Sequence, residues 1–405
     1  MALKQTISAM VPRTLVLKIK YLYQFFNRVK NKRKLIETDC EYSFISKKQA
    51  HVFFGYYDVT PFNKESDEFL YLSLFEKDNY VRIFINNLYN NNKETELGTS
   101  NAWNWQQGCR LRWMPNNSRE IAFNDYNGST YFMRIMNVDT KSERIIKYPL
   151  YDISPDGCLG LTVDFERLGV KRPGYGYTCR KYSDSERDLS SEYIGIVDLK
   201  TNTINTFLTY EEISKVAGNK SDGYKDNYIN HLCFSPSGKQ FLFFWLTART
   251  GLHKADLLVY NIETKSIKLL EEEDIVSHYV WENEDSIICT AIDKNKKGHY
   301  YRYIVSTGKK LLLNPDNLNC DGHPSIYQEG LILTDTYPDL MGFQKLYLAG
   351  TDDNRFELLL SIYSHCCITG ERRTDLHPRF NKDKNLIAFD ANSKGKRNMC
   401  ILKMQ

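Results

Sequence analysis

The chain has 405 residues, enough for several ordinary domains or for one large all-β domain built by repetition. Its formal net charge of +4 is too small to indicate nucleic-acid binding, and we find no nucleic-acid-binding motif in it. Ten cysteines without a CxxC pair favour free thiols in a reducing compartment over a zinc knuckle or a redox pair.

Residues 1–38 are predicted to form a basic N-terminal segment that contains a short amphipathic helix. After Pro12, apolar residues recur at helical spacing, and every charge up to Lys34 is positive. Lys18 and Lys20 interrupt the apolar run, so we expect neither a signal peptide nor a membrane span. Two interpretations remain open: a helix that places a cytoplasmic protein on the anionic inner surface of the membrane, or a helix docked on its own domain. The apolar positions are Leu15, Ile19, Leu22, Phe26 and Val29.

Residues 39–405 contain seven copies of one unit, which has about 45 residues, a length typical of propeller blades. Each copy has an apolar residue, a polar turn and a strand of bulky residues, as in "CFSPSGKQFLFFW" (233–245), and most continue with two more strand-like segments. The predicted fold is therefore an all-β, seven-bladed β-propeller of four-stranded antiparallel blades, with a β-sandwich array as the alternative. The last copy lacks a fourth strand, and "CEYSFISK" (40–47) precedes the first copy without a partner, so we expect this strand to close the ring.

The seven copies share one position, three residues before the apolar landmark. Four consecutive copies have histidine there, which accounts for half of the eight histidines in the chain. Because this position begins the innermost strand, we expect these imidazoles to converge on the central channel. From the first copy to the last, the residues are Tyr56, Arg110, Leu150, His231, His278, His323 and His377.

The loops between second and third strands return to the face on which these histidines lie, and they are basic. The longest insertion (166–191) reaches the same face, whereas the turns on the opposite face are rich in acidic residues. This combination predicts a pocket for an anionic ligand. The alternative is that the histidines tie blades together, with Asp321 and Asp375 as partners, and that the lysines are ordinary solvated surface. The loop cations are Arg249, Lys254, Lys294, Lys296, Lys297, Lys394, Lys396 and Arg397.

Several motifs resemble the seven-bladed propellers of the oligogalacturonate lyase and ulvan lyase groups over roughly residues 50–405; they include "HVFFGYYDVTPF", "NWQQGCRLRWMP", "RPGYGY", "NHLCFSPSGKQFLF", "DGHPS" and "RTDLHPRF". The resemblance implies β-elimination at a uronic acid of an anionic polysaccharide or oligosaccharide, with inner-strand histidines that bind a metal or transfer protons. The metal motif of the oligogalacturonate lyases looks like Gln-x-x-His-x-His. This chain has Arg372, Asp375 and His377 at those places, and an arginine cannot ligate a metal.

For such an elimination the chain needs a base for the proton next to the carboxylate, cations for the carboxylate and an acid for the leaving oxygen. A neutral imidazole suits the base because it titrates near working pH. The predicted residues are His231 or His51 as the base, Arg110 and Arg172 as the cations, and Tyr56 or Tyr175 as the acid.

We also predict a divalent metal, Mn, Ca or Zn, held by His278, His323 and His377 with one position open, and no organic cofactor. Two other classes of function remain open. One is a propeller that binds an anionic glycan or a protein without turnover. The other is a glycosyltransferase or accessory factor in cytoplasmic polysaccharide assembly, which the lack of an export signal suggests.

Overall fold

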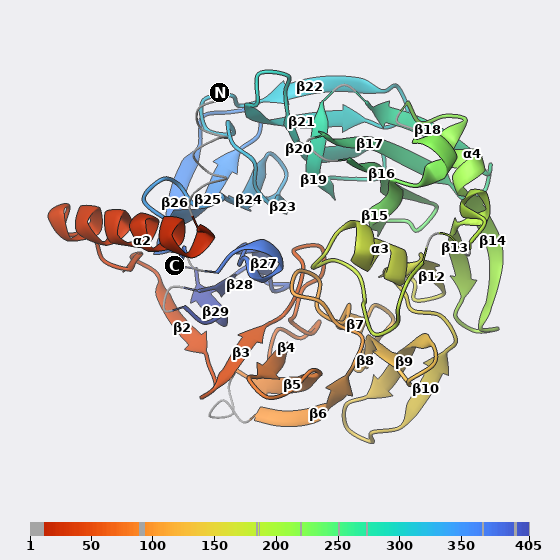
Figure 1. Ribbon diagram of the computed structural model, residues 1–405, viewed down its shortest axis with the longest axis horizontal. Helices are drawn as coiled ribbons and strands as arrows, with labels where there is room; N and C mark the ends of the chain where they lie inside the picture. Colours follow the sequence, from red (N-terminus) through yellow and green to blue (C-terminus); the bar gives the residue numbers. More distant parts are fainter. Residues whose placement is uncertain are drawn as a thin grey trace.

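Seven antiparallel sheets stand around a central axis in the structure, a computed structural model (Figure 1). The predicted seven-bladed β-propeller is confirmed, and the β-sandwich alternative is wrong. Predictions for residues 1–11, for Lys394 and for the side chain of Arg249 lie outside the described residues. The structure describes residues 12–88, 94–183, 185, 187–218, 221–249, 252–272, 274–366, 368–392 and 395–404.

The strands of the first three blades follow one another in chain order from the axis to the rim (Figure 1). Blade one contains β3 (Ala50–Phe53), β4 (Glu68–Phe75), β5 (Val81–Asn87) and β6 (Glu94–Ser100). Blade two contains β7 (Arg112–Met114), β8 (Asn117–Tyr126), β9 (Tyr131–Asn137) and β10 (Glu143–Ile146). Blade three contains β11 (Asp152–Ile153), β12 (Leu159–Thr162), β13 (Tyr193–Asp198) and β14 (Thr203–Thr209).

Blades four to six repeat the same order, and the chain contributes three strands to blade seven at its C-terminal end. Blade four contains β15 (Asn227–Phe234), β16 (Gln240–Arg249), β17 (Leu252–Asn261) and β18 (Ser266–Glu271). Blade five contains β19 (Ile275–Trp281), β20 (Ser286–Ile292), β21 (Gly298–Ile304) and β22 (Lys309–Leu313). Blade six contains β23 (Ser325–Gln328), β24 (Leu331–Asp335), β25 (Phe343–Gly350) and β26 (Phe356–Tyr363), and blade seven contains β27 (Arg379–Phe380), β28 (Leu386–Ala391) and β29 (Asn398–Lys403).

The burial of each strand follows from its place in the blade. Strand β4 reads EFLYLSLF, and its six central residues are all buried, because neighbouring blades pack on both faces of the sheet. The rim strand β14 alternates exposed with partly buried residues over most of its length, as expected for a strand with one wet face. The core therefore lies between the blades, and the channel face is left to the innermost strands.

The fourth strand of blade seven is β2 (Glu41–Ile45), which pairs with β29 from Glu41–Lys403 to Ile45–Met399. The prediction that residues 40–47 close the ring is confirmed. The sequence did not predict β1 (Ile36–Glu37), which pairs with Ile362 and Ser361 of β26 and makes blade six five-stranded. The segment before the first blade is thus joined to the last two blades.

Helices are few. The N-terminal helix α2 (Arg13–Lys30) lies outside the ring beside blades six and seven, and α3 (Phe165–Lys171) lies over the ring near its centre (Figure 1). The other helical segments among the described residues are α4 (Tyr210–Ser214) and the 3-10 turns η2 (Leu189–Ser191), η3 (Asp222–Tyr224) and η4 (Gly370–Arg372). In the described part of the chain, no helix combines the length and the apolarity that a membrane crossing requires.

Candidate functional site

The four histidines of the shared position meet near the axis. Ring centroids are 6.1 Å apart for His231 and His278, 4.0 Å for His278 and His323, and 4.4 Å for His323 and His377. His231 is half-buried and the other three are buried. The backbone repeats as well: His231, His377 and the equivalent Arg110 have φ of 54°, 48° and 55°. Three blades therefore share a left-handed kink that aims these side chains inward.

Tyr56, the equivalent residue of blade one, lies among the histidines. Its ring centroid is 5.0 Å from that of His231 and 4.7 Å from that of His377, and its Oη is 3.4 Å from His231 Nε2. Burial raises the pKa of the Tyr56 hydroxyl well above its ordinary value. The phenol is consequently neutral, and its O–H group is available as a hydrogen-bond donor.

His231 is held in the neutral form. Burial comes first, and the positive charge of a protonated His278 and of Arg172 adds to it; together they lower the pKa of His231 well below its usual value. The backbone N–H of His231 donates to Tyr151 Oη at 3.0 Å, which fixes the kink. A neutral imidazole next to a neutral phenol is a pair suited to proton transfer.

His323 and His377 each have one ring nitrogen bound and one free. His323 donates from Nδ1 to both carboxylate oxygens of buried Asp335, at 2.8 and 3.0 Å, and His377 donates from Nδ1 to the carbonyl of Gly55 at 3.1 Å. The Nε2 atoms of both rings are buried and have no hydrogen-bond partner among the described residues. Leaving such atoms unpaired in the interior is unfavourable, which points to a ligand at this place.

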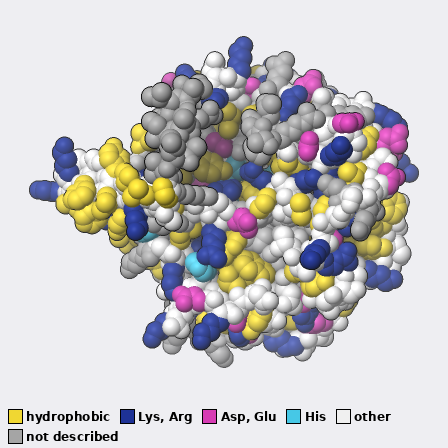
Figure 2. All heavy atoms as spheres, in the orientation of Figure 1, with side chains coloured by type: hydrophobic (Ala, Val, Ile, Leu, Met, Phe, Trp, Pro, Cys, Tyr) yellow, Lys and Arg dark blue, Asp and Glu magenta, His cyan; other side chains and the backbone are white. Residues whose placement is uncertain are grey.

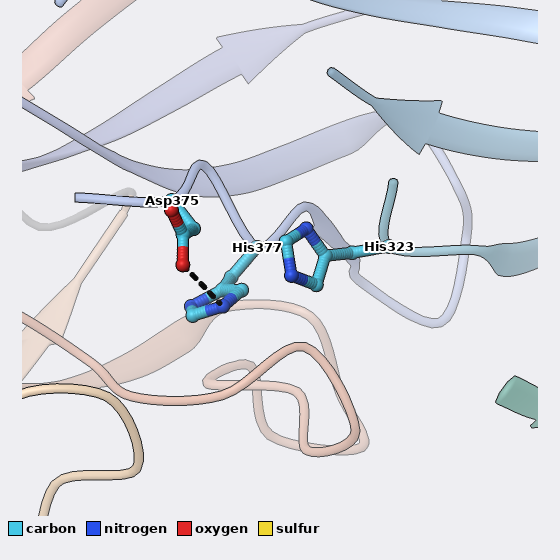
Figure 3. Close-up of side chains that lie close together, drawn as sticks. All are labelled: His323, Asp375 and His377. Carbon is cyan, nitrogen blue, oxygen red and sulfur yellow. Dashed lines mark ion pairs between the residues drawn. The ribbon is translucent and has the colours of Figure 1, made fainter. Parts of the chain in front are cut away.

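Asp375 joins these two histidines. One ligand atom from each of His323, Asp375 and His377 lies within 4.8 Å of the others, and Figure 3 shows the three side chains turned toward one another. The Oδ2 atom of Asp375 is 4.0 Å from Nε2 of His377. Two imidazole nitrogens and one carboxylate oxygen fit a divalent transition metal such as manganese or zinc.

His278, which we predicted as the third histidine ligand, is not part of this group. Its Nδ1 lies 3.2 Å from Asp321 and 3.4 Å from Thr290 Oγ1, so neighbouring polar groups hold its ring. Asp321 comes from the segment before blade six, and the contact ties that blade to blade five. The metal-type group of the structure therefore contains two of the three predicted histidines, His323 and His377, together with Asp375.

A chain of polar contacts holds Asp375. Arg373 donates from Nε to Asp375 Oδ2 at 2.9 Å and from Nη2 to Tyr175 Oη at 2.8 Å. Tyr175 in turn lies above the centre of the site, with its ring 6.0 Å from Tyr56 and 5.9 Å from His231. The insertion in blade three thus covers the histidines and links them to the segment before β27.

Two of the cations predicted on the basic loops are engaged within the protein. Arg397 is buried and donates to the carbonyls of Trp105 and Arg373, and to Thr374 Oγ1 at 3.3 Å, so it fixes the segment that bears Asp375. Lys396 pairs with Glu76 at 2.7 Å. Arg397 is therefore held by the protein itself, whereas the side chain of Lys396 remains partly exposed at the surface beside Glu76.

The insertion is anchored where it leaves blade three. Asp164 caps α3 by accepting from the backbone N–H groups of Glu166 and Arg167. Arg167 is buried and donates from Nη2 to the carbonyls of Asn227, at 2.7 Å, and Tyr224, at 2.6 Å, which fastens α3 to blade four. The helix is therefore a rigid support for the residues that follow it.

Close backbone packing then brings the insertion back over the site. A Cβ atom on Gly176 would overlap the backbone nitrogen of Gly169 and the carbonyl oxygen of Phe165, so only glycine fits there. The turn between them carries Arg172, whose guanidinium carbon is 5.4 Å from the Tyr175 ring centroid. Arg172 and Tyr175, both predicted as site residues, are thereby placed together.

Arg110 has a different geometry from the one that its predicted role requires. It is buried, its Nη1 and Nη2 atoms pair with Asp58 at 3.2 and 2.8 Å, and its Nε donates to the carbonyl of Tyr151 at 2.8 Å. A guanidinium that already binds a carboxylate in two places is poorly suited to neutralise a second one. We therefore assign Arg110 to the support of the site.

His51, the second predicted base, lies apart from the cluster. Its ring contacts Trp105 at 5.2 Å, and its Nδ1 accepts from the backbone N–H of Arg397 at 3.2 Å. Burial, reinforced by the positive charges of Arg397 and Arg372, lowers the pKa of His51 to about 4. Among the described residues, no ring contact joins it to the four central histidines.

Two cavities lie near the insertion. A cavity of about 240 Å³ is lined by Tyr337, Arg373 and Asp375 and by Lys20 and Gln24 of α2, so it leads from the N-terminal helix to the metal-type group. In Figure 2 the same face is hollowed near its middle, where acidic, basic and histidine side chains meet. An open cleft of about 1030 Å³ is lined by Trp103, Trp105, several asparagines and the glycines of the insertion.

No protein-family model and no curated protein matches the chain. Solved structures do match. An oligogalacturonate lyase in complex with manganese has a TM-score of 0.67 at 13% identity, covering 91% of this chain and 94% of that chain. The oligogalacturonate lyase of Vibrio parahaemolyticus has a TM-score of 0.63 at 12% identity, with 91% and 97% covered. The β-propeller domain of the Trilobed protease of Pyrococcus furiosus has a TM-score of 0.52 at 12% identity, with 88% and 94% covered.

At these identities the comparisons establish the fold alone. They confirm the resemblance to oligogalacturonate lyases in architecture, whereas the resemblance to ulvan lyases remains a prediction. A protease propeller shares the same architecture, so the function has to be argued from the side chains. This chain is a seven-bladed propeller similar in fold to the oligogalacturonate lyases.

Proposed function

We propose that this protein binds an anionic, uronate-containing oligosaccharide or polysaccharide and cleaves it by β-elimination. The observation that carries the proposal is the convergence of a neutral imidazole, a neutral phenol and a metal-type group on one channel mouth. The imidazole is His231, the phenol is Tyr56, and the group is His323, Asp375 and His377. The fold shared with an oligogalacturonate lyase in complex with manganese supports the same reaction class.

The chemistry needs one proton acceptor and one proton donor. His231 Nε2 takes the proton from the carbon next to the substrate carboxylate, the electrons of that C–H bond form the new C=C bond, and the glycosidic C–O bond breaks. The leaving oxygen takes a proton from Tyr56 Oη, which lies 3.4 Å from His231 Nε2. The short distance between donor and acceptor suits removal and delivery of protons on the same face of a sugar ring.

The substrate carboxylate needs positive charge, because negative charge builds up on it as the proton leaves. Arg172 is half-buried beside Tyr175, and we assign it this role. A divalent cation held by His323, Asp375 and His377 would supply further positive charge to the same carboxylate. Arg373 positions Asp375 through its Nε and has its Nη2 on Tyr175.

The test is to incubate the full chain with a panel of uronate polymers and oligosaccharides and to follow the ultraviolet absorbance of an unsaturated uronate. We expect absorbance to rise with manganese present, the rate of this rise to drop when a chelator is added, and the rise to be lost in Tyr56→Phe, which keeps the buried ring. New reducing ends without unsaturated product would indicate hydrolysis and contradict the elimination.

A second candidate is a propeller that binds a glycan without turnover, and the larger cleft favours it. Trp103 and Trp105 line this cleft with Asn101, Asn104 and Asn127, and aromatic rings with amides are typical of sugar-binding surfaces. Calorimetry with oligouronates separates the two candidates. Binding without any product, unchanged by Tyr56→Phe, would favour the binding module.

A further inference from the structure

Helix α2 is fastened to the propeller through a polar and aromatic side. Gln24 is buried, its Nε2 donates to the carbonyl of Leu340 at 3.3 Å, and its Oε1 accepts from Tyr363 Oη at 3.1 Å. The ring of Tyr21 stacks on His365, with centroids 5.2 Å apart. These contacts fix the rotation of the helix about its own axis, so its other sides have a defined direction.

The apolar stripe of the helix points away from the protein. Of the 18 large hydrophobic side chains that are exposed in the described part of the chain, eight are in α2, and Phe26 is the most exposed of these at 64%. Leu340 of the propeller is 85% exposed, and its backbone carbonyl lies against Gln24 on the opposite side of the helix, so it is not part of the stripe. Figure 2 shows hydrophobic side chains gathered on the lobe at the left. The stripe consists of Leu15, Ile19, Leu22, Phe26 and Val29.

The charge around this stripe has one sign. No acidic residue occurs between Arg13 and Ile36, and the exposed lysines flank the stripe along the helix and just beyond it. Two copies of this helix placed face to face would bring like charges together, which disfavours self-association. An anionic surface has the complementary charge. The exposed cations are Lys18, Lys20, Lys30, Lys32 and Lys34.

We propose that α2 docks this protein on the surface of an anionic lipid bilayer. The stripe enters the boundary between headgroups and acyl chains, and the lysines lie at the level of the phosphates. The inference goes beyond the proposed function and does not depend on it, since it concerns side chains outside the channel. The side of the helix that packs on the propeller also lines the cavity of about 240 Å³ that reaches Asp375. Membrane binding through the opposite side therefore holds this cavity about one helix diameter, 10–12 Å, from the lipid.

The test is co-sedimentation of the full chain with vesicles of phosphatidylglycerol and phosphatidylcholine, compared with phosphatidylcholine alone. Leu22→Glu and Phe26→Glu place a charge in the stripe and are expected to lower the vesicle-bound partition by about ten-fold or more. Phe356→Glu is the matched control, because Phe356 is also an exposed phenylalanine, on β26, and the binding of this variant should equal that of the wild type. Lys18→Gln and Lys30→Gln should each weaken binding by about five-fold.

Melting curves check that all variants are folded. We expect them to be, because each replaced side chain is exposed. In Phe26→Trp, the new indole should shift its emission to the blue and be quenched by brominated lipid. Equal binding to the neutral vesicles, or wild-type binding by Phe26→Glu, would overturn the proposal. A third outcome would also overturn the proposal. If the wild type is a dimer in ultracentrifugation, Phe26→Glu is a monomer, and neither protein binds vesicles, the stripe is a protein contact.

Discussion

His323 and His377 use their two ring nitrogens for different purposes. The Nδ1 atoms hold the fold, through Asp335 and Gly55, and the Nε2 atoms are free to bind a ligand. Asp335 also accepts hydrogen bonds from the backbone N–H groups of both histidines, at 2.8 and 3.2 Å, and these bonds join blades six and seven. The two interpretations that the sequence left open, blade-tying and ligand binding, are therefore compatible within one ring.

This arrangement makes His377 the better residue for testing the metal. His377→Ala removes one ligand atom and a single side-chain hydrogen bond to a carbonyl, whereas His323→Ala would remove the imidazole that binds both oxygens of the buried Asp335 carboxylate. We expect His377→Ala to weaken manganese binding by about ten-fold or more, measured by electron paramagnetic resonance. His299→Ala on β21, outside the site, is the control. Unchanged manganese binding in His377→Ala would remove this residue from the proposed ligand set.

The lowered pKa of His231 predicts the pH profile of the proposed reaction. A base acts in its neutral form, and a pKa below 6.5 moves the loss of that form to more acidic pH. We therefore expect kcat/KM to stay level as pH falls to about 6.5 and to decline only below it. An acid limb centred above pH 6.5 would contradict His231 as the base. His231→Asn suits the left-handed backbone and should lower kcat by about 100-fold or more without a change in melting temperature.

At the scale of elements, the insertion of blade three acts as a fixed cover. Arg167 anchors α3, and the close passage of Gly176 across α3 brings Tyr175 over the histidines. Gly176→Ala should push this turn away from the site and lower kcat/KM by about ten-fold or more, because misplaced groups lose near-attack geometry. Steady-state kinetics with the oligouronate panel measures it. Gly98→Ala is the control, since the new Cβ would only touch Met136 Cε at 3.7 Å, and it should behave as wild type.

The sequence predicted the elements better than the contacts between them. A repeated unit must bury its faces on its neighbours, so the blades and the closing strand follow from periodicity. The contacts that decide the site connect different blades: Arg110 with Asp58, and His278 with Asp321, 52 and 43 residues apart. The rotamers of these side chains decide which pairs form, and an equivalent position in the repeat does not specify a rotamer. In α2 the apolar pattern predicted a helix, but a polar residue, Gln24, decides which side of the helix packs on the propeller.

For the whole molecule, stability depends on how the ring is closed. Strand β2 contributes five residue pairs to blade seven, and Phe44 packs against its core. Removing residues 1–47 opens the ring, whereas removing residues 1–33 keeps β1 and β2 and deletes only the helix segment. We expect the longer deletion to cost about 3–5 kcal/mol more in unfolding free energy, from several hydrogen bonds of about 1 kcal/mol each. Denaturant titration measures the difference, and equal stability of both deletions would contradict the closure.

Ring closure also sets the order in which the molecule can be made. Glu41 of β2 pairs with Lys403 of β29, and 361 residues lie between them, so β2 must wait for nearly all of the chain to be synthesised. Contacts so distant in sequence form late and slowly, because loop closure has to come before them. Until β29 arrives, β2 is an unpaired strand that another nascent chain could pair with. The late pairing of these two strands makes synthesis the period in which this propeller is most exposed to misassembly.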